Sequence, residues 1–179
     1  REYAIKSVGF TPDRIAAIES RSDKAAAGML NPPFSFAAKD KGLKSCGRAI
    51  DLLGPYQGGG IFVQRAWARD NAALLERFLA AYIEATRMAL NPVNRTQSIE
   101  LIAARLKQDP QVATRTYDEA LLQPRFGIVP EAKLDLEGMR AVLVLRAEIE
   151  GQWSGVAPPI ERYIDAGYYE RALKLVGAL

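Results

Sequence analysis

The chain of 179 residues is long enough for one hydrophobic core of ordinary size, and its 49% apolar and 25% charged residues are typical of a globular protein. The formal net charge of +3 is small and no basic tract occurs, which disfavours nucleic acid as a partner. The absence of histidine and the presence of a single cysteine, Cys46, exclude histidine-based catalysis, most zinc sites and an intrachain disulfide.

The first third of the chain alternates strand-like and helix-like patterns. Residues 3–8, 24–30 and 43–50 are predicted as strands. Between them, Thr11-Pro12 begins a helix with a capping hydroxyl and a proline in the first turn, and residues 33–40 form a second helix ahead of the C-cap glycine Gly42. Repeats of this kind imply parallel strands in an α/β sheet.

The composition changes at residues 55–64, a glycine-rich connector that ends in one more predicted strand, residues 61–64. The rest is predicted to be helical. A long helix capped by Asp70 or Asn71 keeps a 3.6-residue apolar period as far as Asn91-Pro92. Four further helices are predicted along the chain: at residues 96–108, from Asp109-Pro110, from Asp135 to Gly151, and after Asp165.

Several segments resemble a known family in the right order along the chain. Residues 24–34, KAAAGMLNPPF, with Gly42-Leu43, resemble the second-lobe strand–turn–helix of the nitrate, taurine and alkanesulfonate class of ABC-importer solute-binding proteins, which is thiamine-pyrimidine-binding-like. Residues 54–60, GPYQGGG, resemble the crossing back to the first lobe in that class, and residues 162–168, RYIDAGY, are similar to its C-terminal signature.

The resemblance implies an α/β, two-lobed periplasmic binding protein fold of type II, of which this chain holds a part. Residues 1–55 would be the remainder of lobe two, residues 56–64 the inter-lobe crossing, and residues 65–179 the mainly helical C-terminal part of lobe one. The segment that supplies the sheet of the first lobe is expected to lie ahead of Arg1. Exposed helices of lobe one then favour a homodimer of this chain.

The same resemblance implies a function in transport without catalytic residues, metal or cofactor. The protein would capture a small organic ligand, anionic in kind, such as a sulfonate, a carboxylate or nitrate. It would deliver this ligand to the membrane permease of an ABC transporter, so we expect a periplasmic or lipid-anchored extracytoplasmic location. Whether the chain binds a ligand by itself stays open.

Five residues are candidates for ligand contact. The carboxyl ends of parallel strands share one sheet edge, so the turns holding Phe10, Thr11 and Asn31 are predicted to face one cleft, where helix N-termini favour anions. Phe10 is either a ligand wall or core, Thr11 a ligand donor or a simple helix cap, and Asn31 a ligand donor or a turn residue. Tyr56 and Gln57, on the crossing, are ligand contacts or hinge residues.

Two other functions remain open on the sequence. An enzyme on the same fold, related to thiamine-pyrimidine synthesis, would rely on a cysteine-rich segment and a histidine, and this sequence has neither. A regulatory sensor domain shares the two-lobed design, but the long helical part after residue 69 disfavours it.

Overall fold

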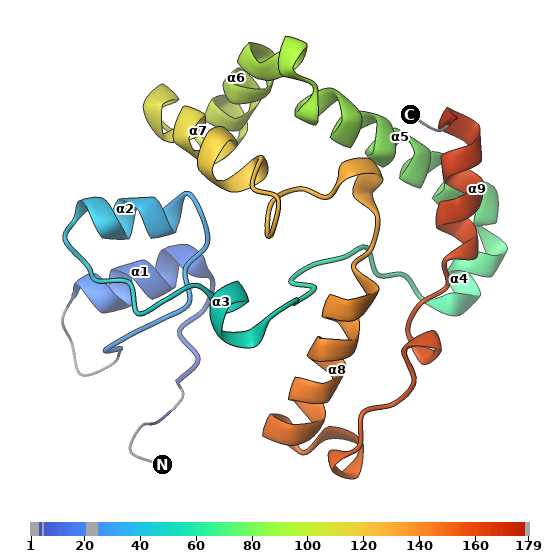
Figure 1. Ribbon diagram of the computed structural model, residues 1–179, viewed down its shortest axis with the longest axis horizontal. Helices are drawn as coiled ribbons and strands as arrows, with labels where there is room; N and C mark the ends of the chain where they lie inside the picture. Colours follow the sequence, from blue (N-terminus) through green and yellow to red (C-terminus); the bar gives the residue numbers. More distant parts are fainter. Residues whose placement is uncertain (1–3, 5, 21–24, 178–179) are drawn as a thin grey trace. The chain divides into compact units, whose positions relative to one another are not determined.

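The computed structural model describes residues 4, 6–20 and 25–177. The chain forms two compact units, Arg1–Cys46 with Ile99–Leu121, and Gly47–Ser98 with Leu122–Leu179. Helices and the segments that join them make up the described residues, as Figure 1 shows. The predicted domain limits at residues 55 and 64 stay a prediction. The predicted crossing, residues 56–64, has no regular structure and belongs to the second unit.

The first unit is built from short helices. They are α1 (Thr11–Glu19), α2 (Phe34–Asp40), most of α6 (Arg95–Leu106), α7 (Pro110–Thr116) and a π-helical turn (Tyr117–Leu121). Helix α1 buries Ile15 and contacts α2. Helix α2 ends at Lys41, and Gly42 follows with φ +82°, which confirms the predicted C-cap glycine. At the start of α7, the Asp109 carboxylate accepts a hydrogen bond from the Gln111 N–H at 2.8 Å, as its cap pattern predicts.

The second unit holds the longer helices. It contains α3 (Ala49–Leu53), α4 (Arg65–Asp70), α5 (Ala72–Leu90), α8 (Leu136–Glu150) and α9 (Gly167–Val176), with 3₁₀ turns at Pro92–Asn94, Pro130–Ala132, Gln152–Gly155 and Ile160–Arg162. The predicted boundaries of α5 and α8 are confirmed. Asn71 is the N-cap residue of α5. Asp135 caps α8, and Gly151 ends it in the left-handed conformation.

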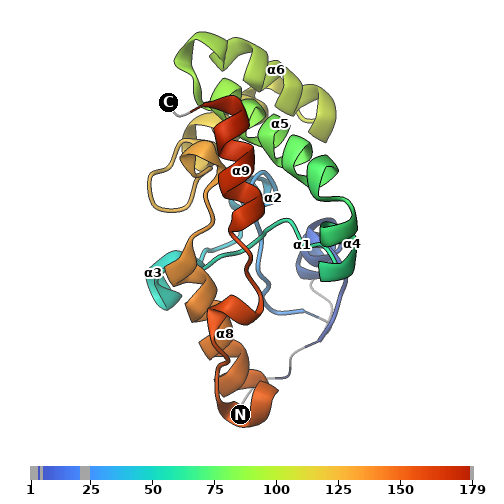
Figure 2. The same cartoon turned by 90° about the vertical axis from the view of Figure 1, so that its right-hand side faces the viewer.

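Helices α5 and α9 pack side by side, which Figures 1 and 2 both show. Their contact is a small core of Ala80, Ile83 and Ala172, surrounded by the half-buried Leu79 and Leu173. Alanines on the facing sides let the two backbones approach closely, so a modest apolar surface is enough to hold this pair together.

Arg87 of α5 fastens the end of this helix pair. Its guanidinium donates to the backbone oxygens of Val176, at 3.2 Å, and Gly177, at 2.7 Å, and pairs with the Glu131 carboxylate. The Tyr169 hydroxyl donates to the Glu131 backbone oxygen at 3.1 Å. Glu131 and Ala132 have φ values of +59° and +56°, a conformation that costs non-glycine residues free energy. These contacts hold the turn in that conformation.

The predicted strands are wrong over the part of the chain that the structure describes, which contains no β-strand; residues 3, 5 and 24 lie outside that part. Helix α3, Ala49–Leu53, begins at the last two residues of the third predicted strand, residues 43–50. A strand is stable only when a neighbour satisfies its backbone groups, and the extended segments here have no such ladder. The α/β two-lobed fold is therefore not confirmed, whereas the mainly helical character after residue 65 is.

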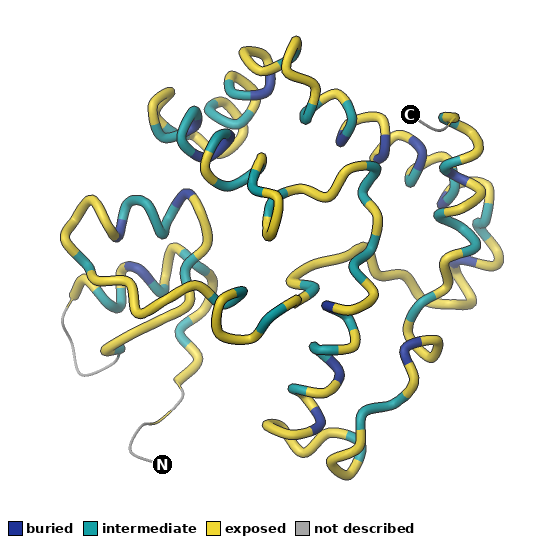
Figure 3. Tube along the Cα trace, viewed as in Figure 1, coloured by how far each residue is buried: buried dark blue, intermediate teal, exposed yellow. Residues whose placement is uncertain are grey.

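Burial does not follow the apolar pattern of α5 completely. Figure 3 shows buried positions recurring along the helices of the second unit, with much of the remaining trace exposed. Leu75 and Ile83 are buried as predicted, but Leu74, Phe78 and Tyr82 are each about half exposed. Cys46 is exposed as well, although free cysteine is a residue type that is commonly buried.

Candidate functional site

Phe10 and Thr11 lie at the start of α1 in the first unit. Phe10 is 82% exposed, so it is no part of a core. Its N–H donates to the Asp13 carboxylate at 3.0 Å, and Thr11 is the first helical residue. The prediction that the Thr11 hydroxyl caps α1 is therefore wrong, because the side chain that caps the helix start is that of Asp13.

Asn31 lies in the second predicted turn of the same unit. Its side chain is exposed, and its backbone oxygen accepts a hydrogen bond from the Ser35 N–H at 3.1 Å. Arg14 joins the two turns, since its guanidinium donates to the backbone oxygens of Gly9, at 3.0 Å, and Met29, at 3.4 Å. Figure 1 shows α1 and α2 beginning on the same side of this unit. Arg14 thus links the two turns, whereas the strands that were predicted to place both turns at one sheet edge are absent from the described residues.

Gln57 fastens the glycine-rich connector to α8 in the second unit. Its side-chain oxygen accepts a hydrogen bond from the Asp135 N–H at 3.0 Å, and its amide NH₂ donates to the Gly59 backbone oxygen. The Asp135 carboxylate in turn accepts from the Gly138 N–H at 3.0 Å. Both ends of the Gln57 amide are thus occupied within the protein, which makes Gln57 a positioning residue for the connector.

Gly138, in the first turn of α8, lies close to the connector. A Cβ atom built on Gly138 would lie 2.7 Å from the Gln57 backbone nitrogen and 2.5 Å from an Asp135 carboxylate oxygen. Both distances are far inside van der Waals contact. Only glycine therefore lets the connector lie against the first turn of α8, and this contact places Tyr56 beside the helix start.

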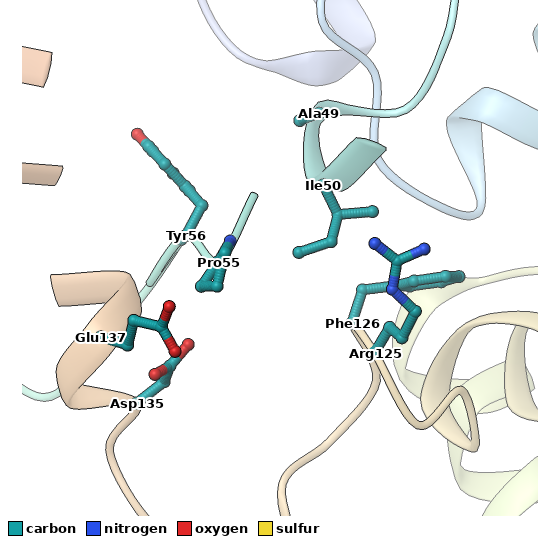
Figure 4. A pocket seen from close by; sticks show the side chains of 9 residues that line it. Ala49, Ile50, Pro55, Tyr56, Arg125, Phe126, Asp135 and Glu137 are labelled. Carbon is teal, nitrogen blue, oxygen red and sulfur yellow. The ribbon is translucent and has the colours of Figure 1, made fainter. Parts of the chain in front are cut away.

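A pocket of about 460 Å³ opens in the second unit between the connector, α3, the segment after the π-helical turn, and the start of α8. Figure 4 shows the side chains around it. Apolar groups of Ile50, Pro55 and Phe126 and the ring of Tyr56 form much of its wall. The full lining is Ala49, Ile50, Pro55, Tyr56, Gly58, Arg125, Phe126, Asp135 and Glu137.

The wall on the side of α3 is organised by Asp51. Its carboxylate accepts from Arg48, at 2.7 and 3.1 Å, and from Arg125 at 3.2 Å. The hydrogen bond from Arg48 is the main cause that lowers the pKa of Asp51, and the charges of both arginines add to it against partial desolvation. The Arg48 guanidinium also lies 5.3 Å from the centre of the Phe126 ring. Arg125 and Phe126 are thereby held at the pocket.

The opposite wall carries two carboxylates, those of Asp135 and Glu137, as Figure 4 shows. Neither makes an ion pair with a described residue, in contrast to Asp51. The pocket therefore has a cationic group on one side and acidic groups on the other, with apolar side chains on both sides. Such a lining can hold and orient a small polar molecule. It offers no nucleophile beside a general base, and among the described residues no group of three or more acidic or cysteine side chains could hold a metal ion.

The structure brings Tyr56 to the pocket and Gln57 beside it, while Phe10, Thr11 and Asn31 lie in the other unit. Sequence reasoning missed Arg125, Phe126 and Glu137, and it identified Asp135 only as a helix cap. These residues follow Tyr56 by about 70 to 80 positions, and no local pattern in the sequence indicates that the two segments meet.

The helices of the described residues include none that is long and apolar enough to cross a membrane. Comparison with protein-family models, with curated proteins and with solved structures finds no match for this chain.

Proposed function

We propose that this chain belongs to an extracytoplasmic solute-binding protein that captures a small organic molecule for the permease of an ABC importer. The observation that carries the proposal is the pocket beside the glycine-rich connector, whose lining includes Tyr56. Tyr56 lies on the crossing that the resemblance to the solute-binding class predicts, where the sequence leaves ligand contact and a hinge role open. The resemblance supports the transport role, and the pocket supports the binding role.

The size and lining of the pocket support a small ligand. A volume of about 460 Å³ lies in the range of small-molecule sites, roughly 300–1,000 Å³. Such sites combine a mainly apolar wall with a few placed polar groups, and Ile50, Phe126 and Tyr56 with one arginine and two acids provide that combination. Binding and release of a solute require no catalytic group.

The test is a binding screen on the whole chain. Thermal unfolding is followed with sulfonates, aliphatic and aromatic carboxylates, nitrate, pyrimidines, amines and amino acids, each up to about 10 mM. A ligand at 100 times its dissociation constant adds about 2.7 kcal/mol to the free energy of unfolding, so a specific ligand raises the midpoint measurably. We expect one chemical class to do so.

Two tyrosine variants locate the binding. Tyr56→Ala removes a ring from the pocket wall, and Tyr82→Ala removes a ring of similar exposure from α5, 49% against 44%. Binding should weaken in the first variant and stay unchanged in the second. The proposal fails when no class shifts the midpoint, or when both variants bind the ligand as the parent chain does.

A further inference from the structure

Helix α5 carries apolar side chains on two faces. One face packs against α9 through the core of Ala80, Ile83 and Ala172. The other face bears a row of apolar residues, every one of which is exposed. This row, called the α5 seam below, consists of Leu74, Phe78, Ala81, Ala85 and Met88. An exposed apolar row that runs along most of a helix is typical of a surface that a protein partner covers.

The spacing of the α5 seam is that of a coiled coil. Its successive members are four, three, four and three residues apart, which is the heptad pattern of a helix that packs along another helix. Ala80 and Ile83, which face α9, stand at other heptad positions. A second helix can therefore pack on the seam without displacing α9.

The seam is nearly symmetric about its middle residue, Ala81. Leu74 and Met88 lie seven residues before and after Ala81. Phe78 and Ala85 lie three and four residues away from it. A second copy of α5 that crosses antiparallel at Ala81 thus places leucine against methionine near both ends, and each phenylalanine ring against a small alanine. A two-fold interface needs such self-complementarity, because every contact in it occurs twice.

The charges beside the seam favour the antiparallel direction. Arg77 and Glu84 are both exposed and, being seven residues apart, flank the seam on the same side. They lie four residues before and three residues after Ala81, so antiparallel pairing brings Arg77 of each copy opposite Glu84 of the other. Parallel pairing would place Arg77 opposite Tyr82, and Glu84 opposite Ala89, and would form no ion pair.

We infer that α5 is a dimerisation helix, through which two copies of this chain pair antiparallel along the α5 seam. The seam spans about 21 Å at 1.5 Å per residue. One helix pair of that length buries less than the roughly 1,200 Å² of total surface found in standard complexes, so we expect a dissociation constant of about 10–100 μM. The seam shares no residue with the pocket lining, and the inference is independent of the proposed function.

Sedimentation velocity of the whole chain at about 5 to 500 μM, under reducing conditions because Cys46 is exposed, tests the inference. We expect a change from monomer to dimer across this range. Phe78→Ala removes the largest ring of the seam from both copies and should weaken the dimer at least about tenfold. Phe62→Ala removes a phenylalanine that is 80% exposed on the connector, and this matched control should dimerise as the parent chain does.

Charge reversal tests the direction of pairing. Arg77→Glu and Glu84→Arg, each alone, bring like charges together at both flanks and should weaken the dimer about three- to tenfold. The double variant restores opposite charges and should dimerise like the parent chain. Glu148→Arg makes the same change in net charge as Glu84→Arg at an exposed position on α8, and it should have no effect.

Each result decides one part of the inference. A chain that stays monomeric at about 500 μM, or a Phe78→Ala variant that dimerises as tightly as the parent, overturns the seam as an interface. Single charge reversals without effect overturn the antiparallel pairing. Circular dichroism checks that Phe78→Ala keeps its helices; should it lose them, the charge variants decide the question, because they replace exposed polar residues only.

Discussion

Substitution of Gly138 by alanine tests the contact that places the connector on α8. The new Cβ would lie 2.7 Å from the Gln57 backbone nitrogen and 2.5 Å from the Asp135 carboxylate. The Asp135 side chain can rotate away, but it then loses its cap on the Gly138 N–H, which costs about 1 kcal/mol. The Gln57 nitrogen belongs to the backbone, so relief of that clash moves the connector itself.

The sign of the effect depends on two opposing contributions. Alanine is favoured over glycine in a helix by about 1 kcal/mol, which stabilises the variant. Overpacking costs about 1–3 kcal/mol, and loss of the cap adds to that. The clash therefore wins, and the expected net loss in the free energy of unfolding is about 2 kcal/mol.

Urea denaturation followed by circular dichroism measures this loss. Gly59→Ala is the matched control on the connector, because a Cβ at Gly59 meets no atom within 4 Å and its φ is not in the left-handed region. It should change the free energy of unfolding by no more than about 0.5 kcal/mol. A Gly138→Ala variant as stable as the parent chain would refute the close approach described for the connector and α8.

Three further outcomes follow from named contacts. Arg87→Ala should lower the free energy of unfolding by about 2 kcal/mol, as measured by urea denaturation. This loss is smaller than for a fully buried ion pair, because the side chains of Arg87 and Glu131 are 15% and 26% exposed. A loss smaller than that of an exposed control such as Arg77→Ala would contradict the reasoning. The hydrogen bond from Arg48 is the main cause of the lowered pKa of Asp51, so the stability that Asp51 contributes is present above the ordinary aspartate pKa and is lost as the pH falls through the lowered value. Asp51→Asn should therefore flatten the acid side of the curve of unfolding free energy against pH. An unchanged slope would count against the pairing of Asp51 with Arg48. Tyr169 has a raised pKa, caused first by burial and then by the Glu131 charge, so the stability that it contributes is complete below about pH 10 and is lost as the pH rises through the raised value. An ultraviolet absorbance titration of the parent chain should show one phenol that ionises late and that is missing in Tyr169→Phe. A parent chain without such a late phenol would contradict the burial of this hydroxyl.

The sequence by itself predicted the longer helices and most of their ends, but not α3, which begins inside a segment predicted as a strand. Asp109, Asp135 and Gly151 act where their residue types predict, because capping is a local event between a side chain and backbone groups of the same turn. The apolar period of α5 likewise predicted a long helix with the correct limits. At the start of α1, the competing cap from Asp13 replaced that predicted for Thr11, since two capping residue types stand within the same turn.

Only the tertiary structure showed that the predicted strands do not form in the described residues, and that distant segments meet at the pocket. Residues 25–30 and 61–64 have the composition of strands, but a strand depends on a partner that no local pattern supplies, and these segments have none in the described structure. Tyr56 lines the same pocket as Arg125, Asp135 and Glu137. The connector can lie close to the start of α8 because Gly138 has no side chain there, and the hydrogen bond from the Asp135 N–H to Gln57 holds it in that position. Contacts between residues so distant in sequence depend on how the helices pack, and the spacing of residue types along the chain does not contain that information.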